Sequence, residues 1–271
     1  MEKDRVTHDQ FFPGAFSDTS VKGRVINKKL LPCFYGNMNW RTIHYTVRCR
    51  MRHPRRWIWI SKIDWKSAYC RQHLNAKTAI KSLTQLCIKG ITLLLAALRL
   101  TFGGNPFPSE WRCISKTIVD LATDILHCGE WDPSEMHSPL QHMMPEPKPL
   151  PPHIPFAPSK SLIVALPPED HGKVDVYIDD TVAIGPCLPG IIPRLAACIL
   201  LSFHLVFCPL SKFEPIPLNK AAAVAKLLAE GGLEETKQIL GWLYDTGRLL
   251  ISLPASVNSS TPLASNAKYT S

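Results

Sequence analysis

The clearest structural signal in this sequence is the segment Val174-Asp175-Val176-Tyr177-Ile178-Asp179-Asp180-Thr181-Val182-Ala183-Ile184. Apolar residues occupy every second position up to Ile178 and resume this alternation from Val182, which is the period of a half-buried β-strand. The segment therefore predicts a tight hairpin with Asp179 and Asp180 at its tip. Two neighbouring carboxylates repel each other unless a cation lies between them, and hard oxygen ligands suit Mg²⁺. An ordinary acidic turn is the alternative interpretation, since Asp is common in turns.

A second acidic site comes earlier in the chain, in Ile58-Trp59-Ile60-Ser61-Lys62-Ile63-Asp64-Trp65-Lys66-Ser67-Ala68-Tyr69. A strand rich in Ile and Trp is predicted to run into Asp64, and a polar turn or short helix follows it. A carboxylate at this strand end, lying beside Asp179, would complete a two-metal site. Such a site activates an attacking 3′-hydroxyl and stabilises a leaving pyrophosphate. A simple helix cap is the alternative role for Asp64.

Four short motifs in this chain resemble those of reverse transcriptases, and they occur in that family's order. Tyr177-Ile178-Asp179-Asp180 resembles the YxDD box, and Asp64 followed by Tyr69 resembles the first palm motif, D-x-x-x-x-[FY]. Leu98-Arg99-Leu100-Thr101-Phe102-Gly103-Gly104-Asn105-Pro106 resembles the L-P-F-G segment, and Leu240-Gly241-Trp242 resembles the L-G-[YFW] primer-grip motif. The sequence around these motifs is most similar to polymerases of LTR-type and tyrosine-recombinase (DIRS-like) retroelements, and the resemblance spans roughly Arg24 to Pro254.

The resemblance implies an RNA-directed DNA polymerase domain with an α+β fold, a right-hand palm and fingers whose antiparallel sheet is backed by helices. Asp64 and Asp179 would be the main ligands of two Mg²⁺ ions, with Mn²⁺ as an alternative metal, and Asp180 would support them. The partners would be an RNA or DNA template-primer and deoxynucleoside triphosphates. The implied nucleotide site comprises Tyr69, Phe102, Gly103, Gly104 and Tyr177, and the implied primer grip comprises Leu240, Gly241 and Trp242. In that site Tyr69 would stack beneath the deoxyribose and exclude a ribose 2′-hydroxyl.

The sequence departs from the family's pattern at three points. Thr101 stands where the family usually has Pro, and Cys70 stands where Arg or another polar residue is common. About 115 residues separate Asp64 from Asp179, several tens more than in compact retroviral enzymes. Lys62 and Lys66 flank the first acid, and two interpretations of them stay open: they neutralise phosphate, or they form an exposed cationic flank.

Charge is distributed unevenly along the 271 residues, whose formal net charge is +9. Residues 1–90 hold 18 Lys and Arg against 5 Asp and Glu, whereas the remaining 181 residues hold 13 against 17. A basic N-terminal part favours contact with a phosphate backbone. The densest basic run supplies the predicted backbone contacts, which are Arg50, Arg52, Arg55 and Arg56. A solvated basic face or a localisation signal is the alternative for this run.

Cysteine usage and hydropathy argue against several other classes of protein. The 9 cysteines are scattered, with no C-x-x-C pair and no paired His spacing, which disfavours a zinc site and a secreted disulfide framework. No signal peptide is visible at the N-terminus. The apolar stretch Leu195 to Leu210 is too short to span a bilayer and predicts a buried helix. We therefore expect an intracellular protein of the cytoplasm or nucleus, without a transmembrane segment.

The sequence divides into five ranges. Residues 1–23 are expected to be flexible, 24–56 to form a basic fingers-like subdomain, 57–213 the palm, 214–254 the primer grip and a partial thumb, and 255–271 a disordered tail. A proline-rich insertion at 128–168 rules out a regular helix or central strand there. It is either a passive surface insertion or a ligand for a proline-binding protein partner.

Two rival interpretations of function stay open. One is a catalytically inactive retroelement relic that keeps the fold and some affinity for nucleic acid. A truncated thumb, the absence of an RNase H or integrase segment, and Thr101 favour it, whereas the intact acids Asp64, Asp179 and Asp180 oppose it. The other is a nucleic-acid-binding module that uses only its basic N-terminal surface. If the thumb is partial, we expect slow synthesis with short products.

Overall fold

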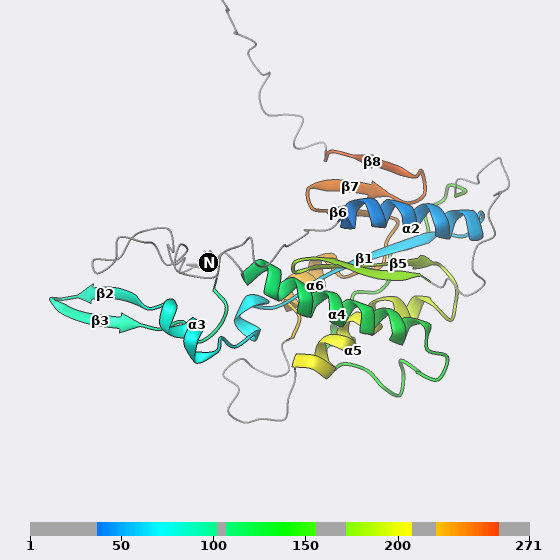
Figure 1. Cartoon of the computed structure of the whole chain (residues 1–271). Helices are drawn as coiled ribbons and strands as arrows, with labels where there is room; N and C mark the ends of the chain where they lie inside the picture. The colour runs from blue at the N-terminus through cyan, green and yellow to red at the C-terminus, as the bar shows by residue number, and fades with distance from the viewer. Residues whose placement is uncertain (1–36, 102–106, 156–171, 208–220, 255–271) are drawn as a thin grey trace, which may run out of the picture.

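The computed structural model describes residues 37–101, 107–155, 172–207 and 221–254. Some predicted features fall outside these ranges: the segment 1–23, the start of 24–56, the end of the proline-rich insertion, the tail 255–271, and the nucleotide-site residues Phe102, Gly103 and Gly104. Within the described ranges the chain forms helices and small antiparallel sheets (Figure 1). The predicted α+β class is therefore confirmed.

A three-stranded antiparallel sheet lies at the centre of the structure, with the strand order β1-β5-β4 (Figure 1). β1 spans Ile58–Asp64, β4 spans Lys173–Tyr177 and β5 spans Asp180–Pro186. A two-residue turn joins β4 to β5, so the predicted acidic hairpin is confirmed. β1 comes from a distant part of the sequence and pairs with the other edge of β5.

Two helices cover one face of this sheet. α4 spans Phe107–His127 and α5 spans Ile192–Phe207; the two pack against each other, α4 also against β4 and α5 also against β5. The strand residues on this face alternate with those on the other and are Trp59, Ile63, Val174, Val176 and Ala183. Burying them removes a large apolar area from water, which is the main favourable term in folding. The acidic hairpin therefore lies on a rigid base.

The sequence predicts the helical character of both α4 and α5. In α4 the apolar residues Trp111, Ile114, Ile118, Leu121 and Ile125 recur at helical spacing, which predicts a buried face. Trp111 and Ile118 on this face are fully buried, whereas Asp120 and Asp124 are exposed. The predicted buried helix from Leu195 corresponds to α5, most of whose residues are buried. Among the described residues, no helix combines the length and apolar character that crossing a membrane requires.

A third helix, α2, covers the opposite face of the sheet. It spans Met38–Arg52, and its Met38 and Cys49 pack with strand residues Ile58, Ile60, Val182 and Ile184. α2 belongs to the range assigned from sequence to a fingers-like subdomain, yet it contacts all three strands directly. The sheet is thus enclosed between α2 on one side and α4 with α5 on the other.

A second small sheet lies beside β1. It consists of β6 (Thr236–Ile239), β7 (Trp242–Asp245) and β8 (Leu250–Ser252), in that order. The chain enters it from α6, Val224–Glu230, through Glu234, whose backbone pairs with Ile60 of β1. Ile239 and Tyr244 join the core cluster beneath α2. This contact fixes the predicted primer-grip segment relative to the central sheet.

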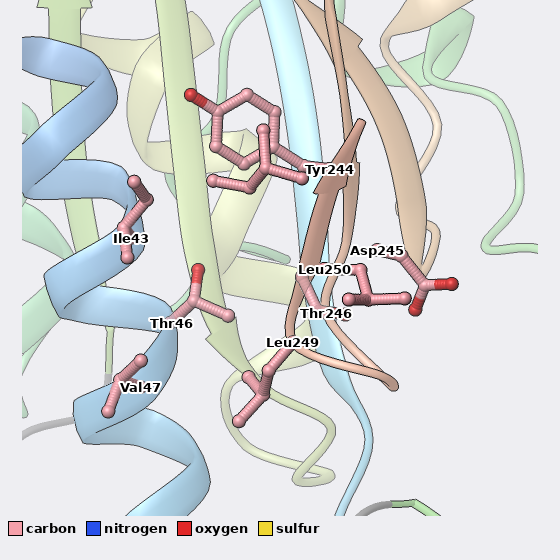
Figure 2. A pocket seen from close by; sticks show the side chains of 9 residues that line it. Ile43, Thr46, Val47, Tyr244, Asp245, Thr246, Leu249 and Leu250 are labelled. Atoms are coloured by element: carbon pink, nitrogen blue, oxygen red, sulfur yellow. The ribbon is translucent and has the colours of Figure 1, made fainter. Parts of the chain in front are cut away.

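α2 and the β7–β8 hairpin enclose a small hollow of ≈ 40 Å³. Figure 2 shows Ile43, Thr46 and Val47 of α2 on one side and Tyr244 and Leu249 on the other. The lining is almost entirely apolar, and so small a space accommodates no nucleotide or metal complex. It is a packing gap between two elements.

A hairpin formed by β2 (Thr84–Ile88) and β3 (Ile91–Leu95) projects from the body next to α3, Ala76–Lys81 (Figure 1). Its register places Leu86 opposite Leu93 and Ile88 opposite Ile91, so these side chains share one face. That face is exposed, with relative accessibilities of 47%, 44%, 48% and 64% for Leu86, Leu93, Ile88 and Ile91. This apolar face is open to solvent among the residues described, and the other face also carries an exposed leucine, Leu94.

The described part of the proline-rich insertion, residues 128–155, contains no strand and no α-helix, only the 3₁₀ turn η3 at Gln141–Met143. This agrees with the prediction. The backbone N–H of Lys148 donates to the carbonyl of Leu233 at 3.0 Å. A ring nitrogen of His153 lies 3.1 Å from Glu235 Oε1, and the imidazole packs edge-on to Trp57. The segment is therefore attached to the approach to β6 at two points.

One ion pair joins α2 to the sheet and should be important for stability. Arg41 Nε and Nη2 donate to the two carboxylate oxygens of Asp175 at 2.5 and 2.9 Å, and the Asp175 side chain is only 4% exposed. We predict that Arg41→Met destabilises the fold by about 3 kcal/mol, because it leaves a buried carboxylate without its partner. Urea denaturation measures the change.

The matched control for this prediction is Lys116→Met, which breaks an exposed i,i+4 pair with Asp120 on α4. It should cost less than about 0.5 kcal/mol. The double change Arg41→Met with Asp175→Asn should recover part of the loss, since it removes the buried charge as well. Equal effects of Arg41→Met and Lys116→Met would contradict the role assigned to this pair.

Candidate active site

The pairing of β1 with β5 brings two acidic residues together at one end of the sheet. Asp64 is the last residue of β1 and Asp180 the first of β5, and the register places them directly opposite each other. Opposed residues on antiparallel strands point to the same face, with Cβ atoms roughly 5 Å apart. From sequence, Asp64 is expected beside Asp179. The structure instead gives Asp180 as its direct neighbour, with Asp179 in the adjoining turn.

The acidic turn has an unusual backbone conformation. Ile178 has a φ of 57°, in the left-handed region that β-branched residues rarely adopt. Such a conformation costs on the order of 1–3 kcal/mol and persists only where surrounding contacts hold it. Trp111 Nε1 on α4 donates to the Ile178 carbonyl at 2.9 Å, and Trp65 Nε1 donates to Thr181 Oγ1 at 2.5 Å. Two buried indoles thus fix the turn that carries Asp179.

Two lysines lie against the acidic pair. Lys62 Nζ is 3.2 Å from Asp180 Oδ1, 3.6 Å from Asp64 Oδ1 and 3.0 Å from Glu230 Oε2. Lys226 of α6 binds Asp64 Oδ2 from the other side. The sequence left two interpretations of Lys62 open, and the structure places it among carboxylates rather than on an exposed flank. The sequence gave no indication of Lys226, because this residue belongs to none of the four motifs.

Burial and these contacts shift the ionisation of the cluster. Burial raises the pKa of Asp180 to about 6, and its hydrogen bond with Asp64 acts in the same direction. Burial also raises the pKa of Asp179. For Asp64, burial is outweighed by hydrogen bonds with Asp180 and Lys226, so its pKa is lowered. For Lys62, burial is outweighed by the attraction of Asp180, Glu230 and Asp64, so its pKa is raised and the ammonium stays charged.

The donor set is chemically suited to a hard divalent cation. Carboxylate oxygens are the ligands that Mg²⁺ prefers, and Asp64 Oδ1 is buried without a hydrogen-bond partner. As the side chains lie, however, no group of three or more His, Cys, Asp or Glu side chains in the described ranges is arranged to hold a metal ion. Lysine ammonium groups supply the positive charge instead. The carboxylates of Asp64 and Asp180 are thus paired with Lys62 and Lys226.

The predicted primer-grip motif lies close to the acidic pair. Leu240 and Gly241 form the turn between β6 and β7, both with positive φ, of 49° and 82°. They line an open hollow of ≈ 500 Å³ together with Lys62, Asp180, Ala229, Glu230, Glu234, Lys237 and Gln238. Trp242 is 42% exposed and lines a neighbouring groove with Leu240 and Tyr177. Three segments distant in sequence therefore surround one space.

The other predicted nucleotide-site residues are placed differently. Tyr69, at the start of the 3₁₀ turn η2 (Tyr69–Arg71), is buried, and its ring lies 6.1 Å from that of Trp111. It belongs to the core that supports the acidic turn, and its contact with a sugar stays a prediction. Phe102, Gly103 and Gly104 are outside the described residues.

The basic run at the end of α2 is only partly exposed. Arg55 and Arg56 are exposed and Arg52 is half-buried. Arg50 is fully buried, and its guanidinium donates to the carbonyls of Arg56 at 2.6 Å and Thr246 at 2.9 Å. The prediction that Arg50 contacts a phosphate backbone is therefore wrong, because its side chain joins α2 to the loop after β7.

Comparison of the chain with known protein families and with curated proteins finds no match in either.

The indole of Trp111 gives a direct test of how the acidic turn is held. We predict that Trp111→Phe destabilises the fold by about 1–3 kcal/mol, because the Ile178 carbonyl loses its buried donor. Amide hydrogen exchange at residues 178–180 should accelerate at the same time. The control is Trp131→Phe, which loses a comparable bond to the Met136 carbonyl elsewhere. Exchange at the acidic turn should be unchanged in that control, and acceleration in both variants would argue against a specific role for Trp111.

Proposed function

We propose that this chain is an RNA-directed DNA polymerase domain, of the type found in LTR-type or DIRS-like retroelements. It would transfer a nucleotide to a primer 3′-hydroxyl on an RNA or DNA template. The observation that carries the proposal is that Asp180, which lies opposite Asp64 in the β1–β5 pairing, and the Leu240-Gly241 turn line one hollow, although their motifs are far apart in sequence. An acidic turn without a function would not be expected to lie next to both Asp64 and the Leu240-Gly241 turn.

The order of the elements also supports the proposal. Asp64 ends β1, helix α4 follows, the acidic hairpin β4–β5 comes next, and α5 leads on to the small sheet with the Leu240-Gly241 turn. These three motifs lie at strand ends or turns, where a scaffold positions reacting groups. We propose on this basis that the sheet β1-β5-β4 with its helices is a polymerase palm.

The chain's own residues would perform three tasks in this reaction. Asp64, Asp179 and Asp180 would hold two Mg²⁺ or Mn²⁺ ions, which, when bound, activate the attacking hydroxyl and neutralise the leaving pyrophosphate. Gly241 adopts the φ of 82° that the turn beside the hollow needs, a conformation that residues with a side chain rarely adopt. The exposed guanidinium groups of Arg55 and Arg56 would contact phosphates of the template-primer.

An inactive relic that retains nucleic-acid binding is the second candidate. The pairing of Lys62 and Lys226 with the acidic residues favours it, because these lysines already neutralise the carboxylates. A module that uses only basic surface residues is a third candidate, and it gives the buried acidic cluster no role.

Primer extension with the purified chain separates these candidates. We predict that Asp64→Asn and Asp180→Asn each reduce extension by at least about 100-fold, because an amide lacks the charge that offsets the metal. Asp120→Asn, on the exposed side of α4, is the control and should retain activity. Template-primer binding without any extension by the wild-type chain would favour the relic. Full activity of both substituted chains would exclude the proposed site.

Binding of template-primer should depend steeply on salt and weakly on sequence. We predict that replacing Arg55 and Arg56 together by Ala lowers the slope of log affinity against log salt by up to about 2, as two phosphate contacts are lost. Fluorescence anisotropy over a salt series measures the slope. Lys116→Ala is the control of the same charge type and should leave the slope unchanged, and an unchanged slope in the double variant would remove this run from the interface.

A further inference from the structure

Lys62 lies where three carboxylates meet, and this position has a consequence for metal binding. Its ammonium contacts Asp180, Asp64 and Glu230 within 3.0 to 3.6 Å. A divalent cation bound between Asp64 and Asp180 would lie within a few ångströms of the same ammonium. Like charges at such a separation repel strongly in a partly buried site. The ammonium and the metal therefore compete for the same oxygens.

Lys226 is a second competitor, with more freedom to move. Its ammonium binds Asp64, but its side chain is 53% exposed, against 12% for Lys62. When a cation takes Asp64, Lys226 can turn into solvent and remain hydrated. Lys62 is confined and needs another anionic partner nearby.

Glu230 provides that partner. It is the last residue of α6, its side chain is 41% exposed, and it lines the hollow that also contains Lys62 and Asp180. Its carboxylate already lies closer to Lys62 Nζ than either aspartate does. Lys62 can thus give up Asp64 and Asp180 without becoming an unpaired buried charge, which would be strongly unfavourable.

We propose that Lys62 and Lys226 are internal counterions that a divalent cation must displace from Asp64 and Asp180, and that Glu230 holds the displaced Lys62 ammonium. The inference rests on the proposed function, because it concerns the same metal site. It assigns positioning roles to Lys62, Lys226 and Glu230, none of which belongs to the four motifs. Removing a lysine should strengthen metal binding, whereas removing Glu230 should weaken it.

The first test measures Mn²⁺ binding to the full chain without nucleotide or nucleic acid, by the electron paramagnetic resonance signal of free Mn²⁺. Lys226→Met should bind Mn²⁺ about tenfold more tightly than the wild type, because the competing ammonium is gone. Lys116→Met also removes one positive charge, but from an exposed pair with Asp120 on α4, and should change affinity less than about twofold. Equal affinity of the wild type and Lys226→Met would overturn the role of Lys226.

The second test is a double-mutant cycle between Lys62 and Glu230. Glu230→Gln alone should weaken Mn²⁺ binding about three- to tenfold, either through Lys62 or by loss of negative charge near the metal. In a Lys62→Met background the same change should have an effect of less than about twofold, because no displaced ammonium needs a partner. An equal loss in both backgrounds would overturn the role of Glu230. Lys62→Gln replaces Lys62→Met if circular dichroism shows that the latter does not fold.

Asp64→Asn distinguishes failure of this inference from failure of the proposed function. If it weakens Mn²⁺ binding while the lysine changes have no effect, the metal site stands and the internal counterions are excluded. If neither the wild type nor the lysine variants bind Mn²⁺ in a manner that depends on Asp64, the inference and the proposed metal chemistry both fail.

Discussion

Asp64 and Asp180 lie opposite each other on neighbouring strands, and their carboxylates repel when both are ionised. The register of β1 against β5 holds the backbones of these two residues directly opposite each other. Burial increases the cost, since it removes water that would screen the charges. Positive charge must therefore be supplied locally, and Lys62 and Lys226 supply it. In a sheet with loosely packed faces, a shift of strand register could relieve the repulsion.

The packing on both faces prevents such movement. α4 and α5 bury one face in a large apolar cluster, and α2 buries the other. The strain at Ile178 is retained for the same reason, because Trp111 holds its carbonyl from inside the core. Geometry at the acidic end is thus determined by apolar contacts throughout the domain. This is the usual requirement for a site that must keep charged groups in fixed positions.

The sequence predicts those parts of the structure that depend on local patterns. The alternation around Asp179 and the helical spacing after Trp111 locate the hairpin and α4, because strand and helix periods are directly visible in the residues. It does not reveal which acid faces Asp64, since strand register depends on pairing between distant segments. The burial of Arg50 cannot be predicted for a similar reason. The Thr246 carbonyl that accepts its hydrogen bond is close in space but distant in sequence. Lys226 reaches Asp64 only through the tertiary placement of α6.

The projecting hairpin β2–β3 affects how the protein behaves in solution. Its aliphatic face is uncharged, whereas the chain as a whole carries a formal charge of +9, which keeps copies apart at low ionic strength. Salt shortens the range of that repulsion, to about 10 Å at 0.1 M, but leaves apolar attraction intact. The same salt releases nucleic acid from basic surfaces. For a chain that binds nucleic acid as proposed, colloidal stability and freedom from bound nucleic acid are therefore opposing requirements.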